Sequence, residues 1–407
     1  MVYIRENEKM DIRLKTYMLL DEVVIYGDKS ETGIAATQMS AMDVPLNILK
    51  NTPSLLGEAD VMKTLQMLPG VQAGTDGSAG VYVRGGGPDE NLILLDGIPL
   101  YNVDHVFGFF SVFTPEAIKK VSLFKGSFPA RFGGRLSSVI DVRTNDGDMH
   151  TYHGTVGIGI LSSKLQLEGP IWKGRTSFNI SGRRSYLDLL ARPFMTKEEK
   201  YGYYFYDLNA KINHKFNDKS RLFLSFYNGM DQLNLDYEDS YTDNSTGIEY
   251  FSKDENTLKW GNTLLAARWN YIFSPKLFSN TTVAFTDYNF KIHSKWSDYI
   301  PNALDSKFDT KYRSGIKDWA YKIDFDYYPR PKHHVKFGAG YMYHDFKPEV
   351  EVTKIYELEE EHLRDTVHSG LSNSHIYANE ISVYAEDNMD ITPRLSVNAG
   401  LHFSLFN

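Results

Sequence analysis

The sequence predicts a mainly β fold, in which a small α+β domain is followed by an antiparallel transmembrane β-barrel. Three observations support this prediction. Residues from about 44 to 147 mix short helical and strand patterns with glycine-rich turns. From about residue 150 onward apolar and polar residues alternate with a period of two, as in strands with one apolar and one wet face. Tight turns then alternate with longer polar segments, which is typical of outer-membrane barrels.

Length, charge and composition narrow the class of protein. The 407 residues suggest two domains, and the net charge of −8 argues against a nucleic-acid partner. The chain has no cysteine, which excludes disulfides and thiolate metal sites. No apolar run approaches the roughly 20 residues of a membrane helix, and the first residues lack a signal-peptide core. Either the protein is soluble and cytoplasmic, or its export signal lies outside this chain.

The first 43 residues are expected to form a mobile arm. Within it, "LDEVVIYGD" at Leu20 to Asp28 has the β-branched residues of a short strand. The domain at 44–147 then begins with an amphipathic helix whose Val61, Leu65 and Leu68 share one face before Pro69 ends it. A second helix is expected to start at Thr114, and strands are expected near Val81–Arg84, Leu92–Leu95 and Val121–Lys125.

Three consecutive glycines, Gly85 to Gly87, raise the question of a phosphate-binding loop. Pro88 offers no amide, acidic residues follow it, and no Lys-Ser/Thr pair or helix comes next. A tight turn between two strands is therefore predicted, with a second turn at Asp96-Gly97. The chain shows no spacing that fixes a catalytic nucleophile, so no enzyme activity, cofactor or metal site is expected.

Residues 148–407 are predicted to form β-hairpins. Tyr321, Ile323, Phe325 and Tyr327 alternate with charged residues, and Leu395 to Phe403 repeat the pattern. Tight turns are expected at 170–174, 216–220, 273–277, 328–333 and 391–394, and long polar loops near 184–203, 229–256, 291–314 and 349–374. An aromatic girdle is expected at the tight-turn end, from Trp172, Phe216, Tyr271, Phe273, Tyr327 and Tyr328.

A soluble sandwich or propeller also has alternating strands, and the alternative function is a soluble β-rich module that binds a ligand or a glycan. In such a fold the inward face would be a filled core. Here the wet face carries charged residues such as Arg183, Arg268 and Lys322. This favours the membrane barrel.

The glycine segment and a second block resemble the plug of TonB-dependent outer-membrane receptors. The first block is carried by Arg84, Gly85, Asn91, Leu95, Asp96, Gly97, Ile98 and Pro99, and the second by Lys125, Gly126, Phe132, Gly133 and the Val139–Val142 strand. The segment Asp21, Glu22, Val23, Val24, Ile25 and Tyr26 lies where this family keeps its TonB box. The resemblance implies three parts: an N-terminal arm (1–43), a plug domain (44–147) and a partial transmembrane barrel (148–407).

The resemblance also implies a function. The plug would block the lumen of a barrel in the outer membrane of a Gram-negative bacterium, an external ligand would bind its apical loops, and TonB would add a strand to the box. A surface lipoprotein is a further partner to consider. The ligand itself stays open. The candidate ligand contacts on the apical loops are Asp76, Asp89, Tyr101, Asn102, His105 and Phe109.

Strand counting predicts an incomplete barrel. We expect ten or eleven strands after residue 150, whereas plugged members of this family close at 22. So small a closed barrel has no room for a plug of about 100 residues. The strands near Tyr152–Leu161 and Leu395–Leu405 are therefore expected to stay unpaired with each other. For the same reason Arg84 and Lys125, which such plugs pair with barrel carboxylates, are expected to lack acidic barrel partners.

Overall fold

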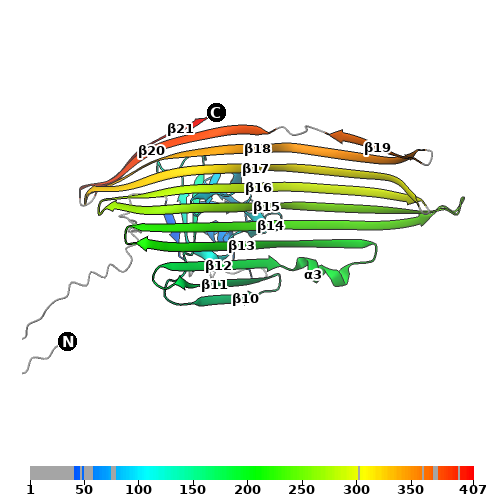
Figure 1. Ribbon diagram of the computed structural model, residues 1–407, viewed down its shortest axis with the longest axis horizontal. Helices are drawn as coiled ribbons and strands as arrows, with labels where there is room; N and C mark the ends of the chain where they lie inside the picture. Colours follow the sequence, from blue (N-terminus) through cyan, green and yellow to red (C-terminus); the bar gives the residue numbers. More distant parts are fainter. Residues whose placement is uncertain are drawn as a thin grey trace, which may run out of the picture.

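A computed structural model describes residues 41–45, 48–49, 58–74, 79–300, 303–359, 362–369, 375–392 and 395–407. Residues 1–40 of the predicted arm, with the TonB-box-like segment, lie outside these residues, as does Asp76. The described residues form a small N-terminal domain and a large antiparallel sheet, which we call the wall (Figure 1).

The N-terminal domain is built on a five-stranded sheet. Its strands are β1 (Ala41–Val44), β4 (Asn91–Leu95), β5 (Ile98–Pro99), β8 (Ile118–Lys125) and β9 (Ser138–Thr144), in the order β1-β8-β9-β4-β5. Only the pair β4 and β9 is parallel among these strands. Two small hairpins complete the domain: β2 (Val71–Ala73) with β3 (Val81–Val83), and β6 (Asp104–His105) with β7 (Phe110–Ser111).

The helix α2 (Val61–Gln66) supplies part of the domain core, as the sequence predicts. Asp60 begins it, because its carboxylate accepts a hydrogen bond from the Lys63 amide at 3.0 Å. Val61 and Leu65 are fully buried and join the core residues of β8 and β9. The helix predicted at Thr114 is wrong: one 3-10 turn (η3, Pro115–Ala117) leads directly into β8. No described helix is long and apolar enough to cross a membrane.

The glycine segment is a turn between β3 and the 3-10 turn η1 (Pro88–Glu90). Gly85 has φ +87°, a conformation that favours glycine. Asn91 fastens this turn to the domain, because its amide donates to the Val81 carbonyl at 2.8 Å and its oxygen accepts from Ser138 at 2.6 Å. Asp96 and Gly97 both have positive φ, which makes the predicted tight hairpin turn between β4 and β5.

The wall contains twelve strands in the described part of the chain. They are β10 (His153–Ile158), β11 (Ser162–Trp172), β12 (Thr176–Ser185), β13 (Glu199–Asn217), β14 (Ser220–Thr242), β15 (Glu249–Ser274), β16 (Leu277–Ile300), β17 (Ala303–Arg330), β18 (His333–Glu359), β19 (His362–Ser369), β20 (Ile376–Thr392) and β21 (Leu395–Phe406). Eleven form one continuous path and β19 pairs with β18 beside it, so the described wall has one strand more than the ten or eleven predicted. Figure 1 shows the tight turns together at one end of the sheet, with the N-terminal domain behind it.

The wall is an open sheet. Its path runs from β10 to β21, and no ladder joins these two strands among the described residues. Contacts with the N-terminal domain come from both ends of the path: Lys164 of β11 pairs with Glu116, and His402 of β21 contacts the carbonyl of Ala130. The wall therefore wraps partly around the domain as an incomplete barrel, as predicted.

The two faces of the wall have opposite chemistry. On β13 the residues at 207, 209, 211 and 213 are buried and polar, and they face the N-terminal domain. Their neighbours Leu208 and Ile212 point outward and are each 40% exposed. This is the reverse of a soluble β-sandwich, and it matches a barrel with lipid outside and water inside. Large aromatic side chains predicted at the tight turns are exposed there, among them Trp172, Phe216 and Phe273.

Three of the four segments predicted as long polar loops are mainly strand. β14 and β15 leave only residues 243–248 between them, and β16 and β17 leave only 301–302. β18, which ends at Glu359, and β19, which follows it, together occupy most of the predicted loop at 349–374. The prediction was wrong because it relied on the polar composition of these segments, whereas backbone pairing with the neighbouring strands keeps them extended. The fourth segment, at 184–203, does contain a connection, with the short helices α3 (Leu187–Ala191) and η4 (Arg192–Phe194).

Candidate functional site

Buried polar contacts hold the N-terminal domain against the wall. They are arranged along β13 at intervals of four residues: Tyr203 lies beside a cavity, Asp207 contacts His105, and Lys211 contacts Asp96. Four residues of a strand span about 13 Å. The series runs from the cavity toward the tight turn that follows Asn217.

His105 makes the most enclosed of these contacts. Its Nδ1 lies 2.6 Å from the Asp231 carboxylate and its Nε2 lies 3.0 Å from the Asp207 carboxylate, while its ring stacks on Phe205 at 4.2 Å. Burial alone would lower the pKa of His105, but the two carboxylates outweigh burial and raise this pKa to about 9. The histidine is therefore a cation at neutral pH, held between two wall carboxylates.

Arg183 balances the charge around His105. Its guanidinium pairs with Asp207 at 2.5 Å and donates to the carbonyl of Ser111 at 2.7 Å. Two carboxylates then face one imidazolium and one guanidinium. Because each charged group has a partner of opposite sign, the cost of burying it is largely offset.

Asp96, in the turn between β4 and β5, makes the second contact. It accepts hydrogen bonds from Thr144 and Ser225 and lies 3.1 Å from the Lys211 ammonium. Burial raises the pKa of Asp96, but Lys211 and its other partners outweigh burial and hold this pKa well below its usual value. The same Asp-Gly turn that reverses the chain thus presents a carboxylate to the wall.

Two further contacts lie on later strands. The Tyr101 hydroxyl donates to Asp318 of β17 at 2.5 Å. The Arg131 guanidinium pairs with Glu386 of β20 at 2.7 Å and stacks over Phe132. Beside it, the His402 ring of β21 lies so close to Gly133 that a side chain there would collide with it. Glycine at this position therefore permits the wall to approach.

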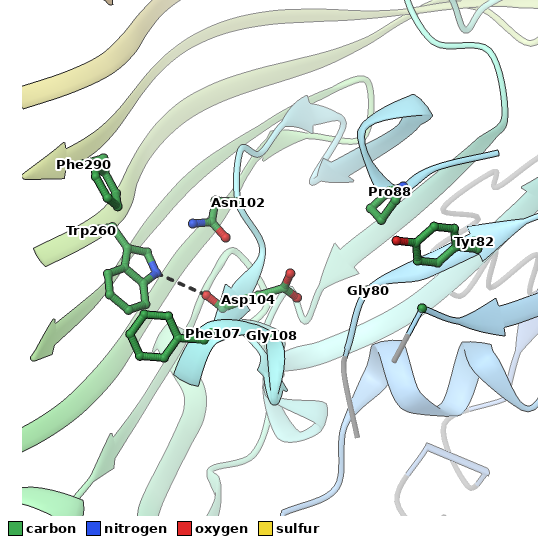
Figure 2. A pocket seen from close by; sticks show the side chains of 10 residues that line it. Gly80, Tyr82, Pro88, Asn102, Asp104, Phe107, Gly108, Trp260 and Phe290 are labelled. Atoms are coloured by element: carbon green, nitrogen blue, oxygen red, sulfur yellow. Dashed lines mark hydrogen bonds between the residues drawn. The ribbon is translucent and has the colours of Figure 1, made fainter. Parts of the chain in front are cut away.

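A cavity of about 380 Å³ opens above these contacts, between the N-terminal domain and the wall (Figure 2). The described residues that line it are Gly74, Gly80, Tyr82, Pro88, Asn102, Asp104, Phe107, Gly108, Trp260 and Phe290. Figure 2 shows Phe107, Trp260 and Phe290 on one side and Tyr82 with Pro88 on the other, with Asp104 between them. Trp260 and Phe290 are partners across β15 and β16.

The turn that carries Phe107 is strained. Val106 and Phe107 both have φ +54°, which non-glycine residues, and β-branched ones above all, rarely adopt. Wall groups hold this turn, because the Val106 amide donates to the Tyr203 hydroxyl at 2.7 Å and to Asp231 at 3.2 Å. The Phe107 ring stays 65% exposed and lies 5.1 Å from Trp260. Such strain, held by surrounding contacts, is typical of binding sites.

The predicted ligand contacts fall in different places. Asn102 lines the cavity, and its amide donates to the Tyr288 hydroxyl at 3.2 Å. Asp89 and Phe109 are exposed but do not line it. Tyr101 and His105 are bound to wall carboxylates, so in this structure they are anchors and not open ligand contacts.

The sequence reasoning missed Asp104, Phe107, Trp260 and Phe290. Asp104 and Phe107 belong to the segment "YNVDHVFGFF", in which Tyr101, Asn102, His105 and Phe109 are the predicted contacts. Trp260 and Phe290 lie next to segments that are predicted to be loops. They meet only because the register of β15 and β16 pairs them, and the sequence does not reveal this register.

The charged residues of the plug motif also have defined positions. The Lys125 ammonium donates to the carbonyl of Pro69 at 2.7 Å, within the N-terminal domain. Arg84 has φ +50° and its guanidinium lies beside Gly126. Among the residues that the structure describes, no group of three or more His, Cys, Asp or Glu side chains is arranged to hold a metal ion.

A small domain fastened by buried polar contacts to the wet face of a sheet with an apolar outer face is the arrangement of a plugged outer-membrane β-barrel. Residues 49–139 match the TonB-dependent Receptor Plug Domain family. Together with the wall, this match identifies the chain as a member of the TonB-dependent receptors, with a plug domain and part of the barrel. From here the N-terminal domain is called the plug.

Relatives agree with this assignment. The chain is 23% identical over 398 residues to a probable TonB-dependent siderophore receptor, PirA, of Acinetobacter baumannii. The match covers 84% of this chain and 50% of PirA, so the chain spans about half the length of that relative. The fold is similar to the RagAB peptide importer, with a TM-score of 0.60, 10% identity and coverage of 91% and 55%. It is also similar to the outer membrane transporter YddB from Escherichia coli, with a TM-score of 0.56, 11% identity and coverage of 90% and 56%.

Proposed function

We propose that the protein imports an external ligand across the outer membrane of a Gram-negative bacterium, with energy supplied through TonB. The ligand binds in the cavity above the plug. TonB pairs with the segment Asp21 to Tyr26 and pulls, and the plug then moves to open a path along the wall.

The observation that carries this proposal is the chemistry of the plug–wall interface. Besides an apolar patch in which wall residues join the plug core, this interface is fastened by ion pairs and hydrogen bonds at His105, Asp96, Tyr101 and Arg131. Water can replace such contacts when the plug is pulled away, because it solvates the separated charges. A polar interface therefore suits a plug that must move.

The position of the cavity supports the direction of transport. Trp260 and Phe290 lie far along their strands from the tight turn that joins β15 to β16, and the anchors lie between the cavity and the tight-turn end. In barrels of this class the tight turns face the periplasm. The cavity therefore opens to the outside, above the contacts that must break.

The relatives suggest candidates for the ligand and the partners. The printed name of PirA makes a siderophore one candidate, and TonB is the expected periplasmic partner. A surface lipoprotein over the cavity is a further candidate partner. No observation in the described structure favours an enzyme or a soluble glycan-binding module over import.

The absence of cysteine from this chain allows a direct test of the TonB contact. A single Val23→Cys change in the full-length protein should form a disulfide with a single cysteine in the β-strand of the cell's own TonB periplasmic domain. Adding Val24→Pro should reduce this cross-link at least tenfold, because proline removes an amide and a strand position. Ile34→Pro, in the same arm but outside the segment, is the matched control and should leave the cross-link unchanged. Equal cross-linking with Val24→Pro would contradict the assignment of the segment.

A further inference from the structure

The inference concerns the chemistry of the ligand and rests on the proposed function of the cavity. Asp104 is the only charged residue among the described residues that line the cavity, and none of these is a lysine or an arginine. A ligand group placed there meets a carboxylate and aromatic rings. Charge complementarity therefore distinguishes cationic ligand groups, which the cavity can accept, from anionic ones.

The Asp104 carboxylate lacks the partners that the neighbouring carboxylates have. Its Oδ1 is buried without a hydrogen-bond partner among the described residues. Asp96, Asp207 and Asp231, by contrast, all accept hydrogen bonds from the plug or the wall. A buried acceptor without a donor costs about 1–3 kcal/mol, which a ligand that supplies a donor would recover.

The surroundings of Asp104 add negative charge. Burial, together with Asp60 and Asp231, raises the pKa of Asp104 to about 6, while His105 acts in the opposite direction. His105 is already paired with two wall carboxylates, so its charge is largely balanced. Near neutral pH the cavity floor is thus an ionised carboxylate whose negative charge is balanced by few nearby positive charges. An anionic group would be repelled from it.

Aromatic rings flank this carboxylate. Phe107 lies 5.1 Å from Trp260 and 6.2 Å from Tyr203, and Trp260 lies 6.3 Å from Tyr203, with Phe290 on the same side. The Trp260 indole donates to the Asp104 carbonyl at 3.5 Å, which keeps the ring beside the acidic residue. Ring faces attract a cation by about 0.5–2 kcal/mol, depending on how far it is desolvated.

We infer that the cavity binds its ligand through an organic cation, an ammonium or guanidinium group, which pairs with Asp104 beside the rings of Phe107 and Trp260. Such a cation has two plausible sources, the free N-terminus of a peptide and a basic side chain or amine. Both donate hydrogen bonds to a carboxylate and both are attracted to ring faces. An iron chelate of net negative charge does not fit this cavity.

Four probes of one tripeptide amide, Ala-Phe-Ala, test the inference. The first has a free N-terminus, the second is N-acetylated, the third is N-acetylated with lysine in place of the first alanine, and the fourth is N-succinylated and anionic. Binding of each to the full-length receptor in detergent is measured by titration calorimetry at pH 7.5. We expect the cationic probes to bind at least tenfold more tightly than the acetylated one, and the succinylated one to bind most weakly. If only the first probe binds tightly, the site recognises a peptide N-terminus. If the third probe also binds tightly, the site accepts any amine.

The variant Asp104→Asn removes the charge and keeps the shape. It should weaken the cationic probes at least tenfold and change the acetylated probe less than twofold. Asp218→Asn, an exposed acidic residue at the tight-turn end, is the matched control and should leave all four affinities unchanged. Because the Asp104 side chain accepts no hydrogen bond at Oδ1, the substitution should leave the β6–β7 hairpin intact, as limited proteolysis will check.

Two results would overturn the inference. The first is that the acetylated or the succinylated probe binds as tightly as the free peptide. The second is that the Asp104→Asn variant keeps the same preference for cationic probes. Either result with an intact Val23 cross-link to TonB would leave the transporter proposal standing. A preference for cations without any cross-link would instead overturn the coupling to TonB and support the ligand class. Failure of every probe to bind, together with loss of the cross-link, would overturn both.

Discussion

The plug and the wall bury opposite kinds of residue. In the plug, β8 and β9 place Val121, Leu123 and Ile140 in a fully buried apolar core. In the wall, β13 buries Asp207 and Lys211 and leaves Leu208 exposed. Both follow one rule, that apolar surface avoids water. The plug has water around it and the wall has lipid outside, so the rule gives inverted patterns.

This difference explains how the two parts meet. The plug presents many polar groups and the wall presents a polar inside, so hydrogen bonds and ion pairs fasten them together. Beside these contacts lies a smaller apolar patch, in which Tyr227, Leu264 and Ala284 of the wall join the plug core. Most of the apolar surface of each part lies away from the interface, in a core or in lipid, so release of the plug exposes only this patch to water.

Removing the His105 cation should weaken the contact between the plug and the wall more than any other change proposed here. His105→Gln leaves Asp207 and Asp231 facing each other without their shared cation, and breaking a buried pair in this way costs about 3–5 kcal/mol. The urea concentration at which proteases cut the 104–111 hairpin of the full-length receptor should fall accordingly. His150→Gln, at an exposed histidine, should not change it. An unchanged midpoint in His105→Gln would show that this residue does not hold the plug.

A charge on the lipid side of the wall should have the next largest effect. Leu224 points outward on β14 and is 43% exposed, so arginine there would lie in hydrocarbon at a cost of about 2–4 kcal/mol. Leu224→Arg should reduce the amount of receptor that is heat-resistant and folded in outer membranes. Thr242→Arg, at the far exposed end of the same strand, is the control and should have little effect. If both variants assemble equally well, the outward face at Leu224 is not in lipid.

The smallest expected effect is one of pH. The pKa of His105 is raised from 6.5 to about 9 in the folded state, so its stabilisation of the plug is complete below pH 6.5 and is lost as the pH rises through 9. Between pH 7 and pH 8 the free energy of plug release should fall by about 1 kcal/mol. The protease assay at these two pH values measures this change. In His105→Gln the difference should vanish, and a persistent difference would assign the titration to another group.

The sequence predicted the parts of the fold in which adjacent residues face different environments. The alternation around Tyr321 and Lys322, the turn at Asp96 and Gly97, and the unpaired outer strands were all predicted correctly. The strand ends within 229–256 and 291–314 were not, because their polar composition resembles that of a loop. Backbone pairing, which leaves no trace in polarity, keeps these ends extended.

The candidate site was predictable only in part. The apical segment was identified, but Asp104 and Phe107 differ from His105 and Phe109 only in which way the strained turn directs their side chains. Trp260 and Phe290 meet through a strand register that the sequence does not reveal. The partners of His105 could not be predicted either, because Asp207 and Asp231 lie 102 and 126 residues away in the sequence and only the fold brings them close.

Such sequence separations impose an order of assembly. Each wall hairpin closes over a few residues, whereas the pair of Arg131 and Glu386 joins positions 255 apart and that of Tyr101 and Asp318 joins positions 217 apart. Loop-closure entropy favours the short connections first. We therefore expect the wall to form one hairpin after another while the plug folds on its own. Docking of the plug onto the wall should be the last step. During assembly in cells, protease protection of the 104–111 hairpin should lag behind protection of the wall, and in a chain caught between the two stages the buried carboxylates of the wall would be exposed to water.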